Sequence, residues 1–193
     1  WATYDLDGST SSDATTLEKA DPAWEPNARY WLSADDVAAR LSSKGWTRQW
    51  LMGWRDITNA TAANSVISTV FPKKAANHKL PLFFCQDFED KQHGLRANLN
   101  SLTLDYTAKQ KIAGTNLTYF YLKQFPVIPP NFYTEARFDF ITERVLQLTY
   151  TSHSLAPFAR DLGYEGPPFA WNEDRRAHLR AELDAFYARA YGL

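Results

Sequence analysis

The sequence predicts an α+β fold, in which short mixed strands accompany a packed central helix and a helical segment follows at the C-terminal end. Aromatic and β-branched residues gather in short runs over residues 46–85, which is typical of strands. Apolar residues recur at helical spacing over residues 95–113 and again over residues 134–193. With 193 residues, 45% of them hydrophobic, the chain is long enough for one substantial core or two small ones.

Residues 1–43 are expected to form an irregular lead-in, because they are rich in Ser, Thr, Asp and Pro and show little periodicity. Within this lead-in, residues 29–33 (Arg-Tyr-Trp-Leu-Ser) are a candidate for a short strand. Ser33 is a favourable N-cap residue for a helix over residues 34–41, and two aspartates then fall in its first turn. The lead-in therefore contains one expected strand and one expected helix.

Residues 44–133 are expected to form the main α+β region. Pro72 ends the second of its three strands, because proline cannot donate a ladder hydrogen bond. The polar, basic residues 73–79 then form a loop that leads to the third strand. The predicted strands are residues 46–57, 64–71 and 80–85.

A single amphipathic helix is predicted over residues 95–113, and Gly114 follows it where a C-cap glycine is expected. After this helix, residues 115–128 have the β-branched and aromatic composition of a strand. Pro129 and Pro130 then force the backbone into extended or turn conformations. The apolar stripe of the helix is Leu95, Leu99, Leu102, Tyr106 and Ala113, and its polar face is Arg96, Asn100, Thr107 and Lys111.

Residues 134–193 are predicted to be helical, and we expect all three regions to form one compact unit. Thr134 and Asn172 are placed to cap two helices, and Gly192 is placed to stop the second. The predicted apolar stripes are Phe138, Ile141, Val145 and Leu148 in the first helix, and Leu179, Leu183, Phe186 and Ala190 in the second.

The net charge of −1 conceals an uneven distribution along the chain. Residues 1–40 carry eight acidic and three basic residues, a net charge of −5. Residues 41–125 carry eleven basic and five acidic residues, a net charge of +6, and residues 126–193 have a net charge of −2. A basic middle third can bind a polyanion locally, because salt screens the more distant acidic residues.

The middle third therefore supplies the candidate binding residues. Arg and Lys can hold phosphates or read guanine, and Asn can read adenine. Trp46, Trp50 and Trp54 interleave with the basic residues, although core packing is the interpretation that we favour for these tryptophans. The candidate DNA-binding residues are Arg48, Arg55, Lys73, Lys74, Lys79, Arg96, Asn100 and Lys111.

We expect no catalytic, metal or cofactor site in this chain. The four histidines and the single cysteine, Cys85, are isolated from one another, whereas metal sites need convergent ligands. No glycine-rich phosphate loop is present, so neither S-adenosylmethionine nor ATP has a recognisable site. A single cysteine suits a reducing cytoplasm. No apolar run approaches the roughly 18–20 residues that span a bilayer, so we expect no membrane association.

Two other functions stay open. Glu89-Asp-Lys91 has the Glu-x-Lys spacing of many divalent-metal nucleases, in which the carboxylate holds Mg²⁺ and the lysine steadies the attacking water. Such sites also need an upstream aspartate on a strand, and the sequence offers no convincing one. The remaining hypothesis is a structural domain that binds other proteins.

A resemblance to a known family favours DNA recognition. Residues 97–130 contain Ala-Asn-Leu-Asn-Ser-Leu-Thr-Leu-Asp-Tyr, then a Gly-Thr turn, then Leu-Lys-Gln-Phe-Pro-Val. This run resembles the target-recognition region of large N6-adenine DNA methyltransferases, which occur in type IIG-like restriction–modification enzymes and related phage-defence systems. Gly53-Trp-Arg-Asp-Ile-Thr58 and residues 157–164 and 175–187 fit the same family, so that the resemblance spans residues 44–193.

The resemblance implies a non-catalytic recognition fragment that binds double-stranded DNA. In this family a methyltransferase domain, which uses S-adenosylmethionine, would precede the fragment in the same polypeptide. Adenine methyltransferases place an Asn or Asp before two prolines and an aromatic residue, to bind the flipped adenine. Here Ile128 precedes the prolines and Asn131 follows them, so the order differs from the catalytic motif.

Overall fold

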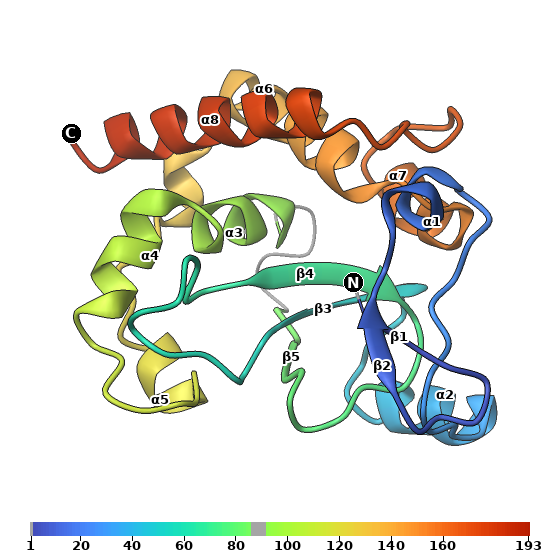
Figure 1. Ribbon diagram of the computed structural model, residues 1–193. Helices are drawn as coiled ribbons and strands as arrows, with labels where there is room; N and C mark the ends of the chain where they lie inside the picture. Colours follow the sequence, from blue (N-terminus) through green and yellow to red (C-terminus); the bar gives the residue numbers. More distant parts are fainter. Residues whose placement is uncertain (1, 86–91) are drawn as a thin grey trace.

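The computed structural model describes residues 2–85 and 92–193, and it confirms the α+β class (Figure 1). The described strands are β1 (Ala2–Tyr4), β2 (Ser11–Asp13), β3 (Trp50–Trp54), β4 (Ser68–Pro72) and β5 (Leu82–Phe83). The described α-helices are α1 (Thr16–Ala20), α2 (Ala34–Ser42), α3 (Gln92–Leu99), α4 (Leu102–Lys109), α5 (Tyr119–Leu122), α6 (Glu135–Thr149), α7 (Ala156–Asp161) and α8 (Glu173–Ala190). Short 3₁₀ turns cover Pro130–Phe132 and His153–Leu155.

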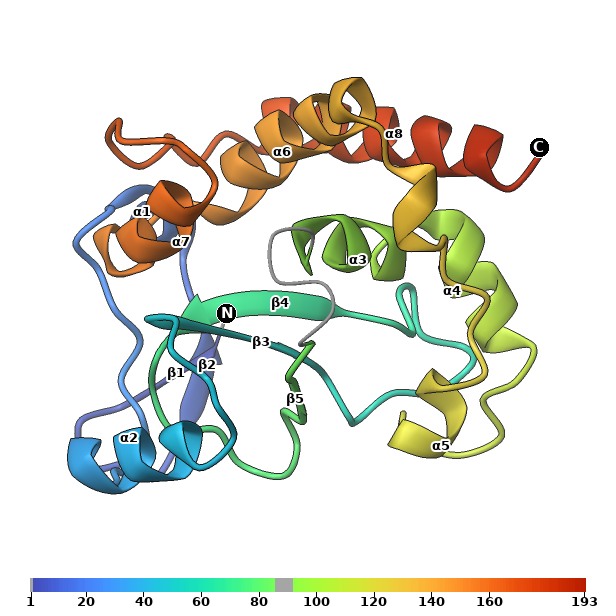
Figure 2. The same cartoon turned by 180° about the vertical axis from the view of Figure 1, so that it is seen from behind.

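Strand β3 is the centre of a three-stranded antiparallel sheet with the order β4-β3-β5. All five of its residues are buried, and it pairs with β4 so that Trp50 lies opposite Pro72 and Trp54 lies opposite Ser68. Figures 1 and 2 show α3 against this sheet and α6 and α8 together in the layer beyond α3. The strands β1 and β2 form a separate two-stranded sheet.

Two hydrophobic clusters form the core. The first joins the sheet to the C-terminal helices, and the second lies under α4 and the segment that follows it. A buried leucine contributes roughly 2 kcal/mol to folding through its removal from water, so each cluster stabilises the packing of the elements that contribute to it. The first includes Trp50, Met52, Val70, Ile141, Val145, Phe158, Leu183 and Tyr187, and the second includes Trp54, Val66, Leu99, Leu104, Ala108, Ile112, Leu117 and Phe125.

The prediction of a single central helix over residues 95–113 is wrong. The helical segment is interrupted at Asn100 and Ser101, which separate α3 from α4. The Ser101 hydroxyl donates to the Asn98 carbonyl and accepts the Leu104 amide, as the N-cap residue of a new helix does. The restart shifts the helical phase. Consequently Leu102 and Tyr106 of the predicted stripe are exposed, whereas Leu104 is buried.

Three further details differ from the sequence prediction. Helix α4 ends at Lys109, so Gly114 is not its C-cap. Residues 115–128 contain the short helix α5 instead of a strand, because burial of Leu117 and Phe125 overrides local β propensity. Residues 29–33 form no strand, since Tyr30–Leu32 are exposed and have no ladder partner there.

The predicted ends of two helices are confirmed. The Ser33 side chain accepts the Asp35 amide at the start of α2, and the Asn172 side chain accepts the Arg175 amide at the start of α8. Gly192 has a φ of 86° just after α8, where only glycine adopts this conformation readily. Thr134 occupies the N-cap position of α6, although its side chain makes no capping hydrogen bond.

Candidate nucleic-acid interface

The structure separates the predicted DNA-binding residues between the two ends of β3. At the Trp50 end, Arg48 forms an ion pair with Asp161 at 2.8 Å. Lys73 is also at this end, since its amide donates to the Gln49 carbonyl at 3.0 Å. The neighbouring Lys74 forms an ion pair with Glu25 at 3.0 Å. Arg55 and Lys79 lie at the other end of the strand.

Arg96 and Asn100 belong to the packing around α3. The Asn100 side chain forms two hydrogen bonds with the backbone of Ser68. Its Oδ1 accepts the Ser68 N–H at 2.9 Å, and its Nδ2 donates to the Ser68 carbonyl at 2.9 Å. The Arg96 Nε is buried and has no hydrogen-bond partner among the described residues. Burial, together with the nearby charge of Arg176, lowers the pKa of Arg96 to about 10. The Asn100 side chain is therefore committed to the backbone of β4, although the residue is exposed, and Arg96 is partly buried.

The buried carboxylate of Asp56 organises the end of β3 near Arg55. Its Oδ2 accepts hydrogen bonds from Asn116 Nδ2 at 2.5 Å and from Lys79 Nζ at 3.1 Å. Its amide donates to the Lys79 carbonyl at 3.0 Å, and its carbonyl accepts the Leu117 amide at 2.6 Å. One residue therefore fastens three segments that are distant in the sequence.

Further contacts fix the segment before α5 to the end of the sheet. The Thr58 amide donates to the Thr115 carbonyl at 3.0 Å, and Trp54 Nε1 donates to the Leu117 carbonyl at 2.7 Å. The ring of Tyr119 lies edge-on to Trp54 with centroids 4.7 Å apart. Its hydroxyl donates to the Leu82 carbonyl at 3.1 Å. The backbone around Asp56 is thus held by the buried Trp54.

The segments that Asp56 fastens, and the residues that flank them in the sequence, carry basic and aromatic side chains, and we name this set of residues the Asp56 face. Lys111 and Lys123 flank the segment, and neither makes an ion pair or a side-chain hydrogen bond within the described chain. Phe120 is 71% exposed and Tyr119 is 51% exposed. The Asp56 face consists of Arg55, Lys79, Lys111, Asn116, Tyr119, Phe120 and Lys123.

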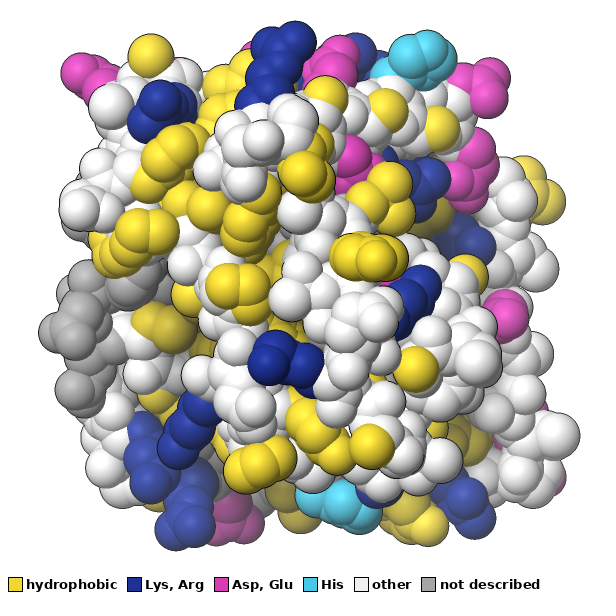
Figure 3. Space-filling model, turned by 90° about the vertical axis from the view of Figure 1, so that its left-hand side faces the viewer, with side chains coloured by type: hydrophobic (Ala, Val, Ile, Leu, Met, Phe, Trp, Pro, Cys, Tyr) yellow, Lys and Arg dark blue, Asp and Glu magenta, His cyan; other side chains and the backbone are white. Residues whose placement is uncertain are grey.

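Figure 3 shows the molecule from the side of α4 and α5. Hydrophobic side chains and Lys or Arg side chains are spread over this view from its top to its bottom, and most acidic side chains lie toward the edges. Exposed aromatic rings next to unpaired lysines suit a polyanion that also presents flat bases and sugars. The face can therefore attract phosphates and contact the groups between them.

A second buried acid supports the neighbouring loop. Asp105 Oδ1 accepts the amides of Ser65 at 2.7 Å and Val66 at 2.8 Å, and Asp105 Oδ2 pairs with Lys109 at 2.9 Å. Lys109 Nζ also donates to the Ala63 carbonyl at 3.1 Å. This arrangement anchors the chain between Arg55 and β4, so that both sides of the Asp56 face rest on buried carboxylates.

The side chains considered for metal-dependent catalysis form no ligand group in the described part of the chain. Within residues 2–85 and 92–193, no group of three or more His, Cys, Asp or Glu residues is placed to hold a metal ion. Glu89 and Lys91 lie outside the described residues. Burial raises the pKa of Cys85, which keeps its thiol protonated near neutral pH.

The interpretation of the tryptophans as core residues is confirmed for Trp50 and Trp54, which are almost fully buried, and Trp46 packs against the same core. Sequence reasoning missed Asp56, Asn116 and Tyr119. An acidic residue directly after an apolar strand was the available signal, but nothing in the sequence identified its partners. No helix among the described residues is long and apolar enough to cross a membrane.

Comparisons with known proteins add no relative: no family model, no curated protein and no solved structure matches this chain.

Proposed function

We propose that this chain binds double-stranded DNA through the Asp56 face and acts as the target-recognition region of an N6-adenine DNA methyltransferase. The resemblance over residues 44–193 supplies the enzyme class. The observation that carries the DNA-binding part is that Arg55 directly precedes Asp56 and that Asp56 fastens Lys79 and the Asn116 segment to it. Lys111 and Lys123, which make no ion pair among the described residues, flank this segment in the sequence. Phosphate contacts by such residues provide affinity without sequence information.

Base recognition would come from side chains that project beyond these phosphate contacts. Arg55 is exposed, and its guanidinium donates to the Asn64 carbonyl at 3.1 Å and to no other group among residues 2–85 and 92–193. Its remaining donors could meet a guanine edge. Phe120 and Tyr119 offer apolar surface to a thymine methyl group or to sugars. Asn116 is committed to Asp56 and serves to position the segment.

In the proposed parent enzyme, the methyltransferase domain and its S-adenosylmethionine site lie upstream in the same polypeptide. This chain then supplies recognition, and the upstream domain supplies the methyl transfer. A restriction–modification or phage-defence role places such an enzyme in the cytoplasm, where it meets DNA. The rigid attachment of the Asp56 face to β3 suits this division, because a recognition surface has to hold its register on the duplex.

The proposal is tested by fluorescence anisotropy of a labelled duplex pool titrated with the 193-residue chain. Lys111→Glu and Lys123→Glu should each weaken binding by about tenfold or more, because each change replaces an attraction to phosphate by a repulsion. Lys44→Glu is the matched control, since Lys44 is exposed just after α2 and outside the Asp56 face. If all three variants bind like the wild type, the Asp56 face is not the DNA-binding surface.

A further inference from the structure

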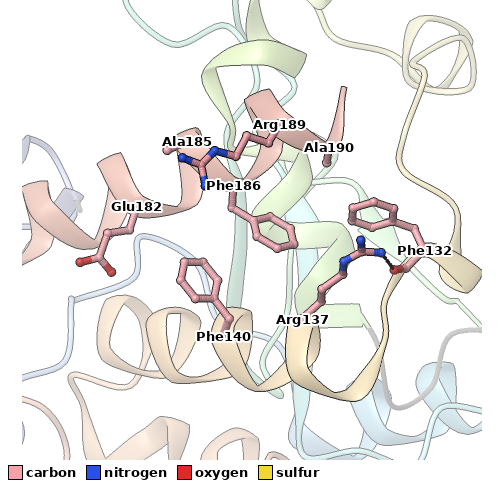
Figure 4. A pocket seen from close by; sticks show the side chains of 8 residues that line it. All are labelled: Phe132, Arg137, Phe140, Glu182, Ala185, Phe186, Arg189 and Ala190. Carbon is pink, nitrogen blue, oxygen red and sulfur yellow. Dashed lines mark hydrogen bonds between the residues drawn. The ribbon is translucent and has the colours of Figure 1, made fainter. Parts of the chain in front are cut away.

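An open pocket of about 470 Å³ lies between helices α6 and α8 on the outer side of the molecule. Figure 4 shows Phe186 pointing from α8 toward α6, between Phe140 on one side and Arg137 with Phe132 on the other. The three rings form an apolar floor. The lining residues are Phe132, Arg137, Phe140, Glu182, Ala185, Phe186, Arg189 and Ala190.

The charge at the rim of this pocket is not balanced. Glu182 is the one acidic residue of the lining, and it is already held by Arg144 Nε at 2.6 Å. Arg137 donates one hydrogen bond to the Phe132 carbonyl at 2.7 Å. Arg189 is exposed and forms no side-chain hydrogen bond or ion pair among the described residues. Two guanidinium groups therefore face the pocket with donors to spare for an oxyanion.

The arrangement of the rings decides which kind of anion fits. Phe140 has the Arg144 guanidinium over its ring at 3.5 Å and is stacked with Phe186, with an interplanar angle of 19°. The Arg137 guanidinium lies over Phe132 at 4.0 Å. A nucleic-acid base needs an open ring face for stacking. These partners occupy ring faces in the pocket, which leaves ring edges and the outer surface of the apolar floor for a side chain of a partner.

We propose that the α6–α8 pocket binds a partner protein through a short acidic segment with an apolar anchor. A phenylalanine or leucine of the partner would rest on the floor formed by Phe132, Phe140 and Phe186. Aspartate or glutamate residues beside this anchor would pair with Arg137 and Arg189. Aromatic residues and arginine are the residue types enriched where proteins bind one another, and an apolar anchor with polar surroundings is the usual arrangement of such contacts.

This docking surface is separate from the Asp56 face. Figures 1 and 2 show α6 and α8 along one side of the molecule, with α5 and the end of β3 toward the opposite side. A partner bound at the pocket would leave the Asp56 face open. The inference does not depend on DNA binding, so the two are tested separately.

The test uses a five-residue synthetic peptide, Asp-Asp-Phe-Asp-Asp, blocked at both ends, and the ¹⁵N-labelled chain observed by NMR. We expect saturable shift changes that are concentrated around Arg137 and Ala185–Ala190. Arg189→Glu should weaken binding by about tenfold. Arg180→Glu, an exposed change on α8 outside the pocket, is the matched control and should change the affinity less than about twofold.

Two control peptides and two tryptophan variants, one that fills the pocket and one that lies outside it, complete the experiment. Peptides with asparagine in place of aspartate, or alanine in place of phenylalanine, should each bind at least about tenfold more weakly. Ala185→Trp should block the pocket, whereas Ala181→Trp on the exposed surface of α8 should not. The proposal is overturned if the peptide shifts no pocket residues, if the asparagine peptide binds equally well, or if an oligothymidine strand occupies the pocket more tightly than the acidic peptide.

Discussion

The Asp56 carboxylate accepts a hydrogen bond from the side-chain amide of Asn116 at 2.5 Å, across 60 positions of sequence. This bond joins the end of β3 to the segment that leads into α5. Lys79 bonds the same carboxylate oxygen, so the loop before β5 is tied to the same point. Because Asp56 is only 7% exposed, water cannot readily replace either partner.

Replacing Asp56 by alanine should destabilise the protein. The change removes two hydrogen bonds to a charged carboxylate, one from the part-buried Asn116 amide and one from the Lys79 ammonium, and the loss of a hydrogen bond to a charged group costs about 1.5–3 kcal/mol. Chemical denaturation followed by tryptophan fluorescence measures the loss. Amide hydrogen exchange should also become faster at Leu117 and Thr58, whose backbone bonds hold the same segment.

Lys79→Ala is the control for this prediction. The Lys79 side chain is 39% exposed, so its ion pair with Asp56 is partly screened and should contribute less than about 1 kcal/mol. If Lys79→Ala proves as costly as Asp56→Ala, the carboxylate acts mainly through the lysine, and its role in holding the Asn116 segment has been overestimated.

Gly53→Ala should be strongly destabilising. A Cβ at this position of β3 would lie 2.5 Å from the Pro81 carbonyl oxygen, which is backbone and cannot rotate away. The clash would push apart β3 and the segment before β5, at an expected cost of about 2 kcal/mol or more. Gly114→Ala is the matched control, because a Cβ there meets nothing within 4 Å and the backbone φ is not positive. Equal thermal midpoints for the two variants would contradict the close approach of Gly53 to the Pro81 carbonyl oxygen.

His93 should make the protein less stable in mild acid. Burial, and secondarily the charge of Arg96, lowers the pKa of His93 to about 4 from its ordinary 6.5. As the pH falls from 6.5 toward 4, the unfolded chain takes up a proton that the folded protein does not bind. The free energy of unfolding therefore decreases over this window, by about 3 kcal/mol in total.

His93→Gln should remove this contribution while keeping a polar group near Thr142, which His93 contacts at 2.8 Å. The measurement is urea unfolding at a series of pH values between 7 and 4 for both proteins. The variant should show a shallower decrease over this window. Parallel curves would mean that His93 is protonated in the folded protein as readily as in the unfolded chain.

Arg96→Met should not destabilise the protein. The Nε of Arg96 is buried and has no partner in the described part of the chain, and methionine fills a similar volume with no charge to desolvate. We expect the free energy of unfolding to stay constant or to rise by up to about 2 kcal/mol. Arg144→Met provides the contrast, since it loses the bond to Glu182 at 2.6 Å and should cost about 1 kcal/mol. A larger loss for Arg96→Met than for Arg144→Met would contradict this assignment.

Local signals in the sequence predicted several element ends correctly. Ser33 and Asn172 cap helices because their short polar side chains satisfy amides within their own segment. The break at Ser101 was missed because the apolar spacing continues through it, although serine in that position starts a new helix. Periodicity reports the spacing of apolar residues and does not show where the backbone hydrogen bonds are interrupted.

The candidate site was less accessible from the sequence than the fold. Charge alone grouped Arg48, Lys74 and Arg55, yet the sheet places Arg48 and Lys74 at the opposite end of β3 from Arg55. Pairing of Lys74 with Glu25, and of Asp56 with Asn116, depends on tertiary contacts between distant segments. Such partners become visible only when the chain is folded.

The salt dependence of duplex binding tests the DNA-recognition proposal most directly. Binding constants of the wild type, Lys111→Ala and Lys123→Ala are measured over a range of salt concentrations. The logarithm of the binding constant falls as the logarithm of the salt concentration rises, and each lysine that contacts a phosphate steepens this negative slope by about 0.9. We predict that each variant has a slope smaller by about one than the wild type, while Lys44→Ala keeps the wild-type slope. Slopes that do not change in the Lys111 and Lys123 variants, or a wild-type chain that binds no duplex at low salt, would contradict the proposal.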